Sequence, residues 1–356
     1  YNFFDFLKLV WQTKSYLRDI NFFTKISISQ FAARFKDPFL REVFPMVIDM
    51  KEMSLFGLVI TWAQLHNKNG GFPIGGSLEF AKSIEKRLLD LGGKIYFNKR
   101  VEKILVSDGK ANGILLQNGE KIMADYVISC ADLHTTLHHM LDGKYVEPQL
   151  DNLFRNAKLY HSSVQVSFGV NMDLSGEPDC IAEVYKLPTP LMIGNQSKEW
   201  FTLHNYSFDS TMAPKGKTVL SCAFTTDDFD YWEQLYKDRV AYKAEKKRIL
   251  KVVSEELDRK FPGFIAAIEV TDVLSPMTYV RYTGNLKGSY MSWIMTPAVM
   301  KQNRVVKKTL PGLDNFWLSG MWVLPPGGVP TGAKTSRDVI HFICRKDKKK
   351  FVTTEL

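Results

Sequence analysis

The stretch Gly320–Ile340, "GMWVLPPGGVPTGAKTSRDVI", combines the end of a strand, a Pro/Gly turn and the start of a helix. Gly327 and Gly328 lack a Cβ, so the backbone at this turn can approach a ligand closely. Pro330 fixes the chain just before the expected helix, whose first-turn N–H groups are free to donate hydrogen bonds. Such a helix start suits an anionic or electron-rich ligand. The alternative is a plain loop that begins a surface helix.

A second Gly/Pro loop, "NGGFPIGGS" at 69–77, precedes an amphipathic pattern. Ser77 is predicted to be the N-cap of a helix, and Gly92-Gly93 is predicted to end it. The loop has no lysine where phosphate-loop chemistry requires one. Apolar residues recur at helical spacing on one face of this helix: Leu78, Ala81, Ile84, Leu88 and Leu91.

Strand patterns follow this helix. Short β runs are predicted at 95–97, 101–106 and 114–116, and Asn118-Gly119 marks a tight hairpin. The run "YVISC" at 126–130 is nearly all apolar, which predicts a strand buried on both faces. We expect the chain to return to this layer at 316–318, "FWL". The pattern indicates half of a Rossmann-like α/β nucleotide-binding layer.

The remaining residues predict a second domain, in which helices cover a mixed sheet. Strict alternation over 164–170 and the apolar run Thr218–Thr226 predict two of its strands. One long helix is predicted from about Trp232 to Lys260. Residues 1–65 are rich in Phe, Leu, Ile and Met and indicate helices interrupted at Pro38 and Pro45. Large apolar residues of this second region are expected mainly in the core, the alternative being an apolar tunnel.

Composition and charge restrict the class of protein. The chain has 356 residues, 45% of them hydrophobic and 24% charged, as globular proteins do. Its net charge of +9 includes the run "RKDKKK" at 345–350, which predicts a solvated tail or, alternatively, a contact with an anionic membrane. No nucleic-acid-binding module is present. Four widely spaced cysteines predict reduced, mostly buried thiols, and with no signal peptide we expect a cytoplasmic protein, associated with membranes at most peripherally.

The residues 318–340, "LSGMWVLPPGGVPTGAKTSRDVI", resemble the C-terminal flavin-binding signature of the phytoene desaturase family. That family includes carotenoid isomerases and retinol saturases within the wider amine-oxidase-like flavoprotein group. Residues 70–132 resemble the stretch in which the family completes its FAD domain, and 275–290 resemble a segment that precedes the last motif. The resemblance implies FAD as cofactor and a mixed α/β and α+β fold with a Rossmann-like domain and a substrate domain.

The resemblance also implies a division of the chain. Residues 1–65 would be the helical part of the substrate domain, and 66–150 the second part of the FAD-binding domain. Residues 151–309 would complete the substrate domain, and 310–345 would be the C-terminal FAD-binding segment. Residues 346–356 would form a basic tail.

Site residues follow from the same resemblance, position by position. The backbone of Val101 matches the position that holds the adenine, and Ala131 and Asp132 end the strand beside the dinucleotide. The other matched cofactor positions are Gly320 near the ribityl and phosphate chain, Gly327, Gly328, Val329 and Pro330 at the isoalloxazine edge, and Ala333 at the helix start.

Two positions depart from the pattern. Met321 stands where many relatives of the wider group have an acidic residue, and Thr335-Ser336-Arg337 stands where Ser-Gly-Arg is usual. Arg281 and Tyr282 are the polar candidates to face substrate, with a salt-bridged Arg and a packed Tyr as the alternative. The loop at Gly75 and Gly76 is the expected entry near the flavin.

The family begins with a strand, a G-x-G-x-x-G turn and a helix that takes the FAD pyrophosphate. No G-x-G occurs anywhere in this sequence. The chain thus resembles a family member without its N-terminal portion. His134 and His138 have the i, i+4 spacing that could share a helix face, but without a third ligand no metal site is predicted.

Two functions remain open from the sequence. The first is an FAD-dependent oxidoreductase that desaturates, saturates or isomerises C–C bonds of a long apolar polyene or isoprenoid. No catalytic side chain is identified, because hydride transfer to or from a flavin needs no obligatory acid–base residue. NAD(P) would enter as the reductant for saturation. The second is a non-catalytic module of the same fold that binds prenyl or lipid groups without flavin. The residues indicate no oligomeric state.

Overall fold

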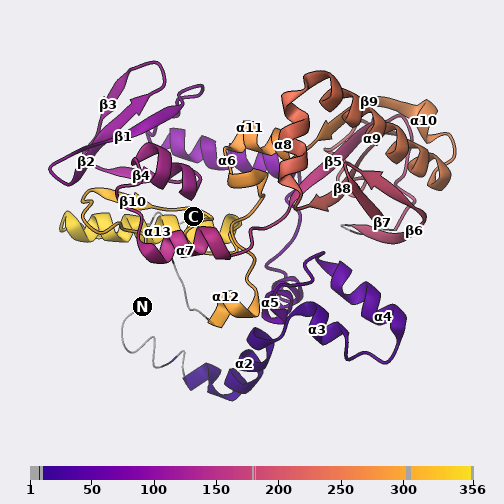
Figure 1. Cartoon of the computed structure of the whole chain (residues 1–356), viewed down its shortest axis with the longest axis horizontal. Helices are drawn as coiled ribbons and strands as arrows, with labels where there is room; N and C mark the ends of the chain where they lie inside the picture. Colours follow the sequence, from indigo (N-terminus) through magenta and orange to yellow (C-terminus); the bar gives the residue numbers. More distant parts are fainter. Residues whose placement is uncertain (1–7, 9–10, 179, 181, 302–305, 354–356) are drawn as a thin grey trace.

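The computed structural model describes Lys8, residues 11–178, Cys180, residues 182–301 and residues 306–353. Figure 1 shows an indigo group of helices near the N-terminus, a sheet covered by helices, and a third group that holds both α6 and the C-terminal helix α13. The fold is mixed, with helices and both parallel and antiparallel strands.

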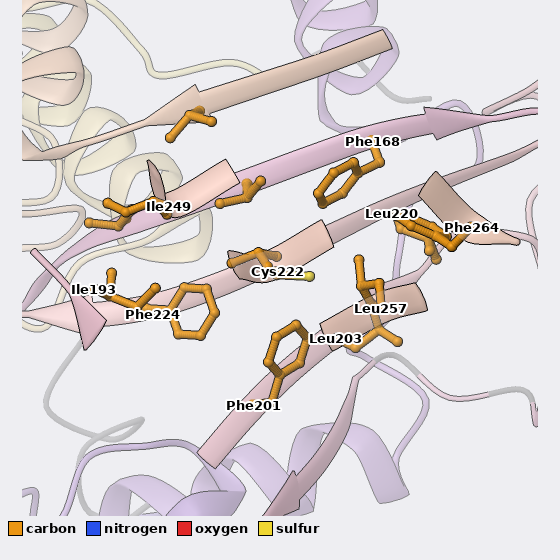
Figure 2. Packing of buried hydrophobic residues seen from close by; sticks show 14 of the residues in the cluster. Phe168, Ile193, Phe201, Leu203, Leu220, Cys222, Phe224, Ile249, Leu257 and Phe264 are labelled. Carbon is orange, nitrogen blue, oxygen red and sulfur yellow. The ribbon is translucent and has the colours of Figure 1, made fainter. Parts of the chain in front are cut away.

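A five-stranded antiparallel sheet forms the larger core. Its strand order is β6 (Glu183–Ile193), β7 (Gln196–Asn205), β8 (Thr218–Thr226), β5 (Ser162–Val170) and β9 (Ile268–Leu274). The predicted alternation holds in β5, where Val164, Val166, Phe168 and Val170 are all buried. β8 has the predicted bounds. Figure 2 shows the side chains of this buried cluster, in which the rings of Phe201 and Phe224 contact each other, 5.5 Å between centroids.

Two helices, not one, cover this sheet. The predicted helix over 232–260 is divided into α8 (Phe229–Lys237) and α9 (Arg239–Lys260). Asp238 separates them, because its backbone is extended and its carboxylate accepts the N–H groups of Val240 and Ala241. An Asp at this position is a favourable N-cap for the second helix. The short α10 (Phe264–Ala267) follows α9.

Helices predominate before residue 67, as predicted. They are η1 (Lys14–Tyr16), α2 (Leu17–Lys25), α3 (Ile28–Ala32), α4 (Pro38–Val43), η2 (Phe44–Val47) and α5 (Leu55–His66). Pro38 does not interrupt a helix but begins α4, because Asp37 caps the N–H of Phe39 and proline is tolerated in the first turn.

The third group of elements begins with α6 (Gly76–Asp90) and the antiparallel strands β1 (Val101–Ser107), β2 (Lys110–Leu116) and β3 (Lys121–Met123). Next come β4 (Val127–Ser129), the π-helix η3 (Thr135–Met140) and α7 (Pro148–Asn156). The chain returns through α11 (Pro276–Thr283), η4 (Leu286–Gly288) and α12 (Pro297–Lys301) to β10 (Phe316–Leu318) and α13 (Val329–Lys346). β10 lies parallel to β4, with Phe316 opposite Val127, so the predicted return is confirmed.

Several local predictions about this group are wrong. Gly75, in a left-handed conformation, precedes α6, so Ser77 lies within the helix and does not cap it. Residues 95–97 are assigned to no strand, since no strand pairs with them among the described residues. β4 is not buried on both faces, because 39% of Ile128 is exposed.

The cysteines and the basic run also differ in part from expectation. Only Cys222 is buried, and all four thiols are free. The basic side chains of 345, 346 and 348–350 are exposed, as expected for a solvated run, but Lys346 donates to the side chain of Asn315 and Asp347 accepts the hydroxyl of Tyr126. Phe351 stacks on His341, 3.8 Å between ring centroids. In the described ranges, no helix combines the length and the apolar character that crossing a bilayer requires.

Candidate active site at the start of α13

The N-terminus of α13 is open. Gly327 and Gly328 both have positive φ angles, 107° and 93°, and no side chain caps the helix. The helix begins at Val329, so Pro330 lies in its first turn and not ahead of it. A Cβ on Gly328 would have no protein atom nearer than the Met291 methyl at 3.7 Å. Gly328 is half-buried, and a Cβ there would stand at ordinary contact distance from Met291 and Pro330, so the backbone of the turn and the N–H groups of the first helical turn are bordered by few protein atoms.

Buried hydroxyl groups fix α13 against β10. The backbone N–H of Gly320 donates to Oγ1 of Thr335 at 3.0 Å, and Oγ of Ser319 donates to the same oxygen at 3.2 Å. Thr335 is fully buried. Gly320 has φ 94°, and a Cβ there would lie 3.5 Å from the carbonyl oxygen of Cys130. The end of β10 and the helix thus form one rigid unit, which suits a bound cofactor.

The segment around Ser292 contacts the turn before α13. The N–H and hydroxyl of Ser292 both donate to the carbonyl oxygen of Pro326, at 3.1 and 3.0 Å. Ser292 also accepts the backbone N–H of Tyr160 at 2.9 Å. The rings of Tyr160 and Tyr290 meet edge to face, 5.7 Å apart. Tyr160 and Tyr290 are therefore connected, through Ser292, to the turn that precedes α13.

Tyr160 has a raised pKa. Its side chain is buried and donates to Sδ of Met53, and burial raises its pKa to about 12. The neutral phenol is favoured because a phenolate would lose its hydration. Tyr160 is therefore protonated at neutral pH and can pack or donate a hydrogen bond, but it cannot act as a general base.

A cavity of about 640 Å³ lies between the N-terminal helices and the sheet. Asp49, on its wall, accepts the hydroxyl of Thr225 at 2.6 Å. Nζ of Lys198 donates to the carbonyl oxygen of Thr225 at 2.7 Å, and burial lowers the pKa of this lysine. The wall mixes apolar and charged side chains: Pro45, Met46, Trp200, Arg41, Glu42 and Lys51 are among them. This cavity is not an apolar tunnel. Most large aromatic residues of the sheet lie in the core, as expected, whereas Trp11, Phe39 and Trp62 in the N-terminal helices are exposed, contrary to expectation.

The predicted adenine and dinucleotide positions lie on other elements. Val101 begins β1, beside a hollow of about 400 Å³ lined by 98–100 and 116–118. Ala131 is exposed just after β4. Asp132 is buried, and its carboxylate accepts the N–H groups of Thr135 and Leu286, at 2.8 and 2.9 Å. Asp132 therefore has a structural role in joining η3 to η4.

Ala333, the remaining predicted cofactor residue, is exposed in α13. Met321, where an acidic residue is usual, packs against Gly327: a Cβ added to that glycine would lie 2.8 Å from Cβ of Met321. Met321 thus packs against the glycine turn. None of these interactions tests whether the predicted cofactor residues bind FAD, so their role stays a prediction.

The predicted substrate residues are dispersed. Arg281 and Tyr282 are exposed on α11, where the guanidinium lies over the ring of its neighbour. Neither lines the cavity. The N–H of Gly75 donates to the carboxylate of Asp209 at 2.8 Å, and Gly76 lies against Met212, so this loop is attached to the segment after β7. Their contact with substrate stays a prediction.

His134 and His138 do share a helix face, with ring centroids 4.4 Å apart. The helix is the π-helix η3, and Phe154 packs against both rings. Burial lowers the pKa of His134, and the neighbouring His138 lowers it further. Within the described part of the chain, no three His, Cys, Asp or Glu side chains come together as a metal site would need.

Sequence reasoning missed Tyr160, Tyr290, Ser292 and the Ser319–Thr335 pair. The tyrosines lie 130 positions apart and come together only through the pairing of 158–160 with 292–294. The hydroxyls at 319 and 335 stood within the quoted motif, and their spacing across the turn was the available signal.

The structure combines an antiparallel sheet domain with a Rossmann-like layer. The N-terminus of α13 carries no side-chain cap and follows two glycines. This arrangement is typical of a two-domain flavoprotein. The family model for flavin containing amine oxidoreductase matches residues 9–339. The chain belongs to this family.

The curated relatives that the chain resembles are carotenoid isomerases and desaturases. The chain is 30% identical to the chloroplastic prolycopene isomerase of Daucus carota over 225 residues, which covers 62% of this chain and 35% of the relative. It is 26% identical to the neurosporene-forming phytoene desaturase of Rhodobacter capsulatus over 316 residues, 83% of this chain and 58% of the relative. The chain thus spans between about a third and three fifths of the length of these relatives.

Solved structures show the same fold. An oxidoreductase from Methanosarcina mazei superposes with a TM-score of 0.59 at 15% identity, over 96% of this chain and 73% of that one. A putrescine oxidase superposes with a TM-score of 0.57 at 12% identity, over 92% and 69%. The alternative of a non-catalytic prenyl-binding module is not favoured, since the named curated relatives are an isomerase and a desaturase.

Proposed function

We propose that this chain carries the substrate domain and part of the flavin site of an FAD-dependent oxidoreductase that acts on C–C bonds of a polyene or other long isoprenoid. The observation that carries this proposal is the uncapped N-terminus of α13, which follows Gly327 and Gly328. Two hydrogen bonds fix its position: Ser292 donates to the carbonyl oxygen of Pro326, and the N–H of Gly320 donates to Thr335. Polyene substrates follow from the names of the relatives, a prolycopene isomerase and a phytoene desaturase.

The residues present fit a flavin. A ring edge would lie against the half-buried Gly328, which has no Cβ, and the N–H groups of the first turn of α13 would stabilise negative charge there. Val329 and Pro330 would border the ring and Gly320 the ribityl chain. Val101 and Ala131 would lie along the dinucleotide. When bound, the flavin supplies hydride transfer to or from the substrate carbon.

The chain's own contribution to the reaction would be positioning and exclusion of water. Tyr290, which is exposed, would hold the apolar substrate against the ring edge together with Met291, and the buried ring of Tyr160 would support Tyr290 from behind. Because Tyr160 is neutral, it would not remove a proton from the substrate. Desaturation, saturation and isomerisation all fit such a site, and NAD(P) would be the reductant for saturation. The domain boundaries stated from the sequence belong to this proposal, as does peripheral contact with a membrane.

Titration with FAD tests the proposal. Quenching of flavin fluorescence is followed for the chain and for Gly328→Ala, in which the new Cβ makes only ordinary contacts with protein but enters the ligand space. The matched control is Gly143→Ala, another left-handed glycine with open space around it, in the turn after η3. We expect saturable binding that Gly328→Ala weakens at least tenfold and the control leaves unchanged. Equal binding by both variants would exclude α13 as the flavin site.

Turnover is then followed by the visible absorbance of prolycopene and phytoene with the FAD-loaded protein. A change of absorbance that needs FAD supports a polyene substrate. Flavin binding without any polyene conversion, in the fully assembled protein, would overturn the substrate class and leave the cofactor site standing.

A further inference from the structure

Lys198, in β7, is half-buried and has no carboxylate partner in the described part of the chain. Its ammonium group donates to Oε1 of Gln196 at 2.9 Å and to the carbonyl oxygen of Thr225 at 2.7 Å, and both acceptors are neutral. An ammonium group has three N–H donors. One donor and the whole positive charge are therefore left for another partner.

Other lysines whose side chains are largely covered do have a carboxylate partner. The side chain of Lys260 is 25% exposed, and its Nζ lies 2.7 Å from Glu183. The side chain of Lys308 is 19% exposed, and its Nζ lies 3.2 Å from Asp338. Burying a charge costs free energy unless an opposite charge or a ligand offsets it. The unpaired ammonium group of Lys198 is the exception that needs an explanation.

Lys198 lines the cavity of about 640 Å³ between the N-terminal helices and the sheet, and Arg41 of α4 lines the same cavity. The guanidinium group of Arg41 donates to two backbone carbonyl oxygens just before α4, at 2.6 and 3.4 Å. These bonds fix the group but do not neutralise it. The neighbouring Glu42 is already paired with Lys186 at 2.7 Å. Within the described ranges, the cavity thus has two cations without a counter-charge.

The wall also carries negative charge, but it is kept apart from Lys198. Asp49 accepts the hydroxyl of Thr225 at 2.6 Å, whereas Lys198 donates to the carbonyl oxygen of the same residue. Asp49 and Lys198 form no ion pair within 4 Å. Burial lowers the pKa of Lys198, and the more distant charges of Asp49 and Asp227 offset this effect only in part.

Apolar side chains form another part of the wall. Ala33, Pro45 and Met46 come from the N-terminal helices, and the half-buried Trp200 comes from β7. A cavity of this volume is in the range that holds small organic molecules, and it is much larger than a single inorganic ion requires. The wall therefore suits a ligand that has both a charged group and an apolar part.

We propose that this cavity binds a small amphiphilic anion. Its carboxylate or phosphate group would accept hydrogen bonds from Lys198 and Arg41, and its apolar part would lie against Ala33, Pro45 and Trp200. Charge-assisted hydrogen bonds of this kind are about twice as strong as neutral ones. Binding would need no flavin, so the inference is independent of the proposed function.

Titration calorimetry of the full chain with four probes tests the proposal. Octanoate and octyl phosphate carry the two candidate anionic groups, octanol has the same apolar part without charge, and inorganic phosphate has the charge without an apolar part. We expect octanoate, octyl phosphate or both to bind at least tenfold more tightly than octanol and inorganic phosphate. The tighter of the two identifies the anionic group. Binding of none of the probes would overturn the proposal, as would octanol or inorganic phosphate binding equally well.

Variants of Lys198 show whether its charge is recognised. Lys198→Met keeps a long side chain without the charge and is expected to weaken anion binding at least tenfold, whereas Lys198→Arg should retain most of it. The matched control is Lys217→Met, which removes the charge of another partly covered lysine, paired with Glu269 directly before β8. It should leave binding unchanged. Thermal unfolding checks that each variant folds. Equal weakening by Lys198→Met and Lys217→Met would mean that only net charge matters and would overturn the site.

The sign of the ligand's charge is tested at Asp49. Asp49→Asn removes a negative charge, while the amide oxygen can still accept the hydroxyl of Thr225, and asparagine tolerates the positive φ of 46° at this position. Because a repulsive charge is lost, anion binding should become at least twofold tighter. Weaker binding would mean that the cavity takes a cation or a zwitterion, and would overturn the proposal. Failure of the chain to bind FAD would count against the proposed function and leave this inference intact.

Discussion

The helices α9 and α6 differ in what the fold does with an apolar face. α9 buries Tyr242, Ile249, Val253 and Leu257 against the five-stranded sheet, whereas α6 buries only Gly76. Both segments are predicted from sequence as amphipathic helices, and both form. The difference is the partner: α9 has the whole antiparallel sheet beneath it, and α6 has none within the described chain. A pattern of apolar residues predicts that a face will be covered, but not which polypeptide covers it.

Truncation of one apolar side chain in the sheet core and one in α6 should show this difference most strongly. Phe201 is fully buried between Tyr185 and Phe224, so Phe201→Ala is expected to lower the free energy of unfolding by about 3–5 kcal/mol. Ile84→Ala in α6 is expected to change it by about 0.5 kcal/mol or less. Urea unfolding followed by tryptophan fluorescence measures both. A large loss in Ile84→Ala would show that α6 is already covered in the isolated chain.

The glycine turn before α13, in contrast to α6, is closely packed. Gly327 has φ 107°, and a Cβ there would lie 2.8 Å from Cβ of Met321. Gly327→Ala is expected to cost about 1–3 kcal/mol of stability, because an added methyl group must displace packed neighbours. Thermal unfolding measures this cost. Gly143→Ala, which has a positive φ but no close neighbour, should cost less. Equal costs would mean that the backbone angle alone is responsible and that Met321 gives way.

The smallest expected effect concerns pH. Burial lowers the pKa of His134, so the folded chain binds a proton there less readily than the unfolded chain, whose histidines have a pKa of about 6.5. Stability contributed by the neutral ring is present above that value and decreases as the pH falls below it. The groups around the ring are His138 and His139, which disfavour its charge, and Asp132, which favours it.

The melting temperature of the chain should therefore decrease between pH 7 and 5. His134→Phe keeps an aromatic ring against Phe154 but cannot titrate, so its pH dependence should be shallower. Identical slopes for the two proteins would place the pH dependence elsewhere, for example at His161, whose pKa burial also lowers.

Local signals in the sequence determined most of the elements. Alternation over 164–170 gave β5, the Asn118-Gly119 pair gave the hairpin between β2 and β3, and the glycine turn at 327–328 gave the open start of α13. These features depend on neighbours within a few positions, where period, capping and φ preference act. They were sufficient for a mixed helix and strand fold, whereas the family followed from the resemblance of 70–132, 275–290 and 318–340 to known flavoproteins.

Tertiary structure decided the rest. Asp132 links two segments that are 154 positions apart, because the fold brings the N–H of Leu286 to its carboxylate. The tyrosine pair at 160 and 290 formed by a similarly long-range pairing. The strand expected at 95–97 did not form, because a strand needs a partner to receive its hydrogen bonds. The sequence of this chain by itself specifies which faces are apolar and which backbones can turn; which faces are covered is decided by tertiary packing, because a local pattern does not determine the partner surface.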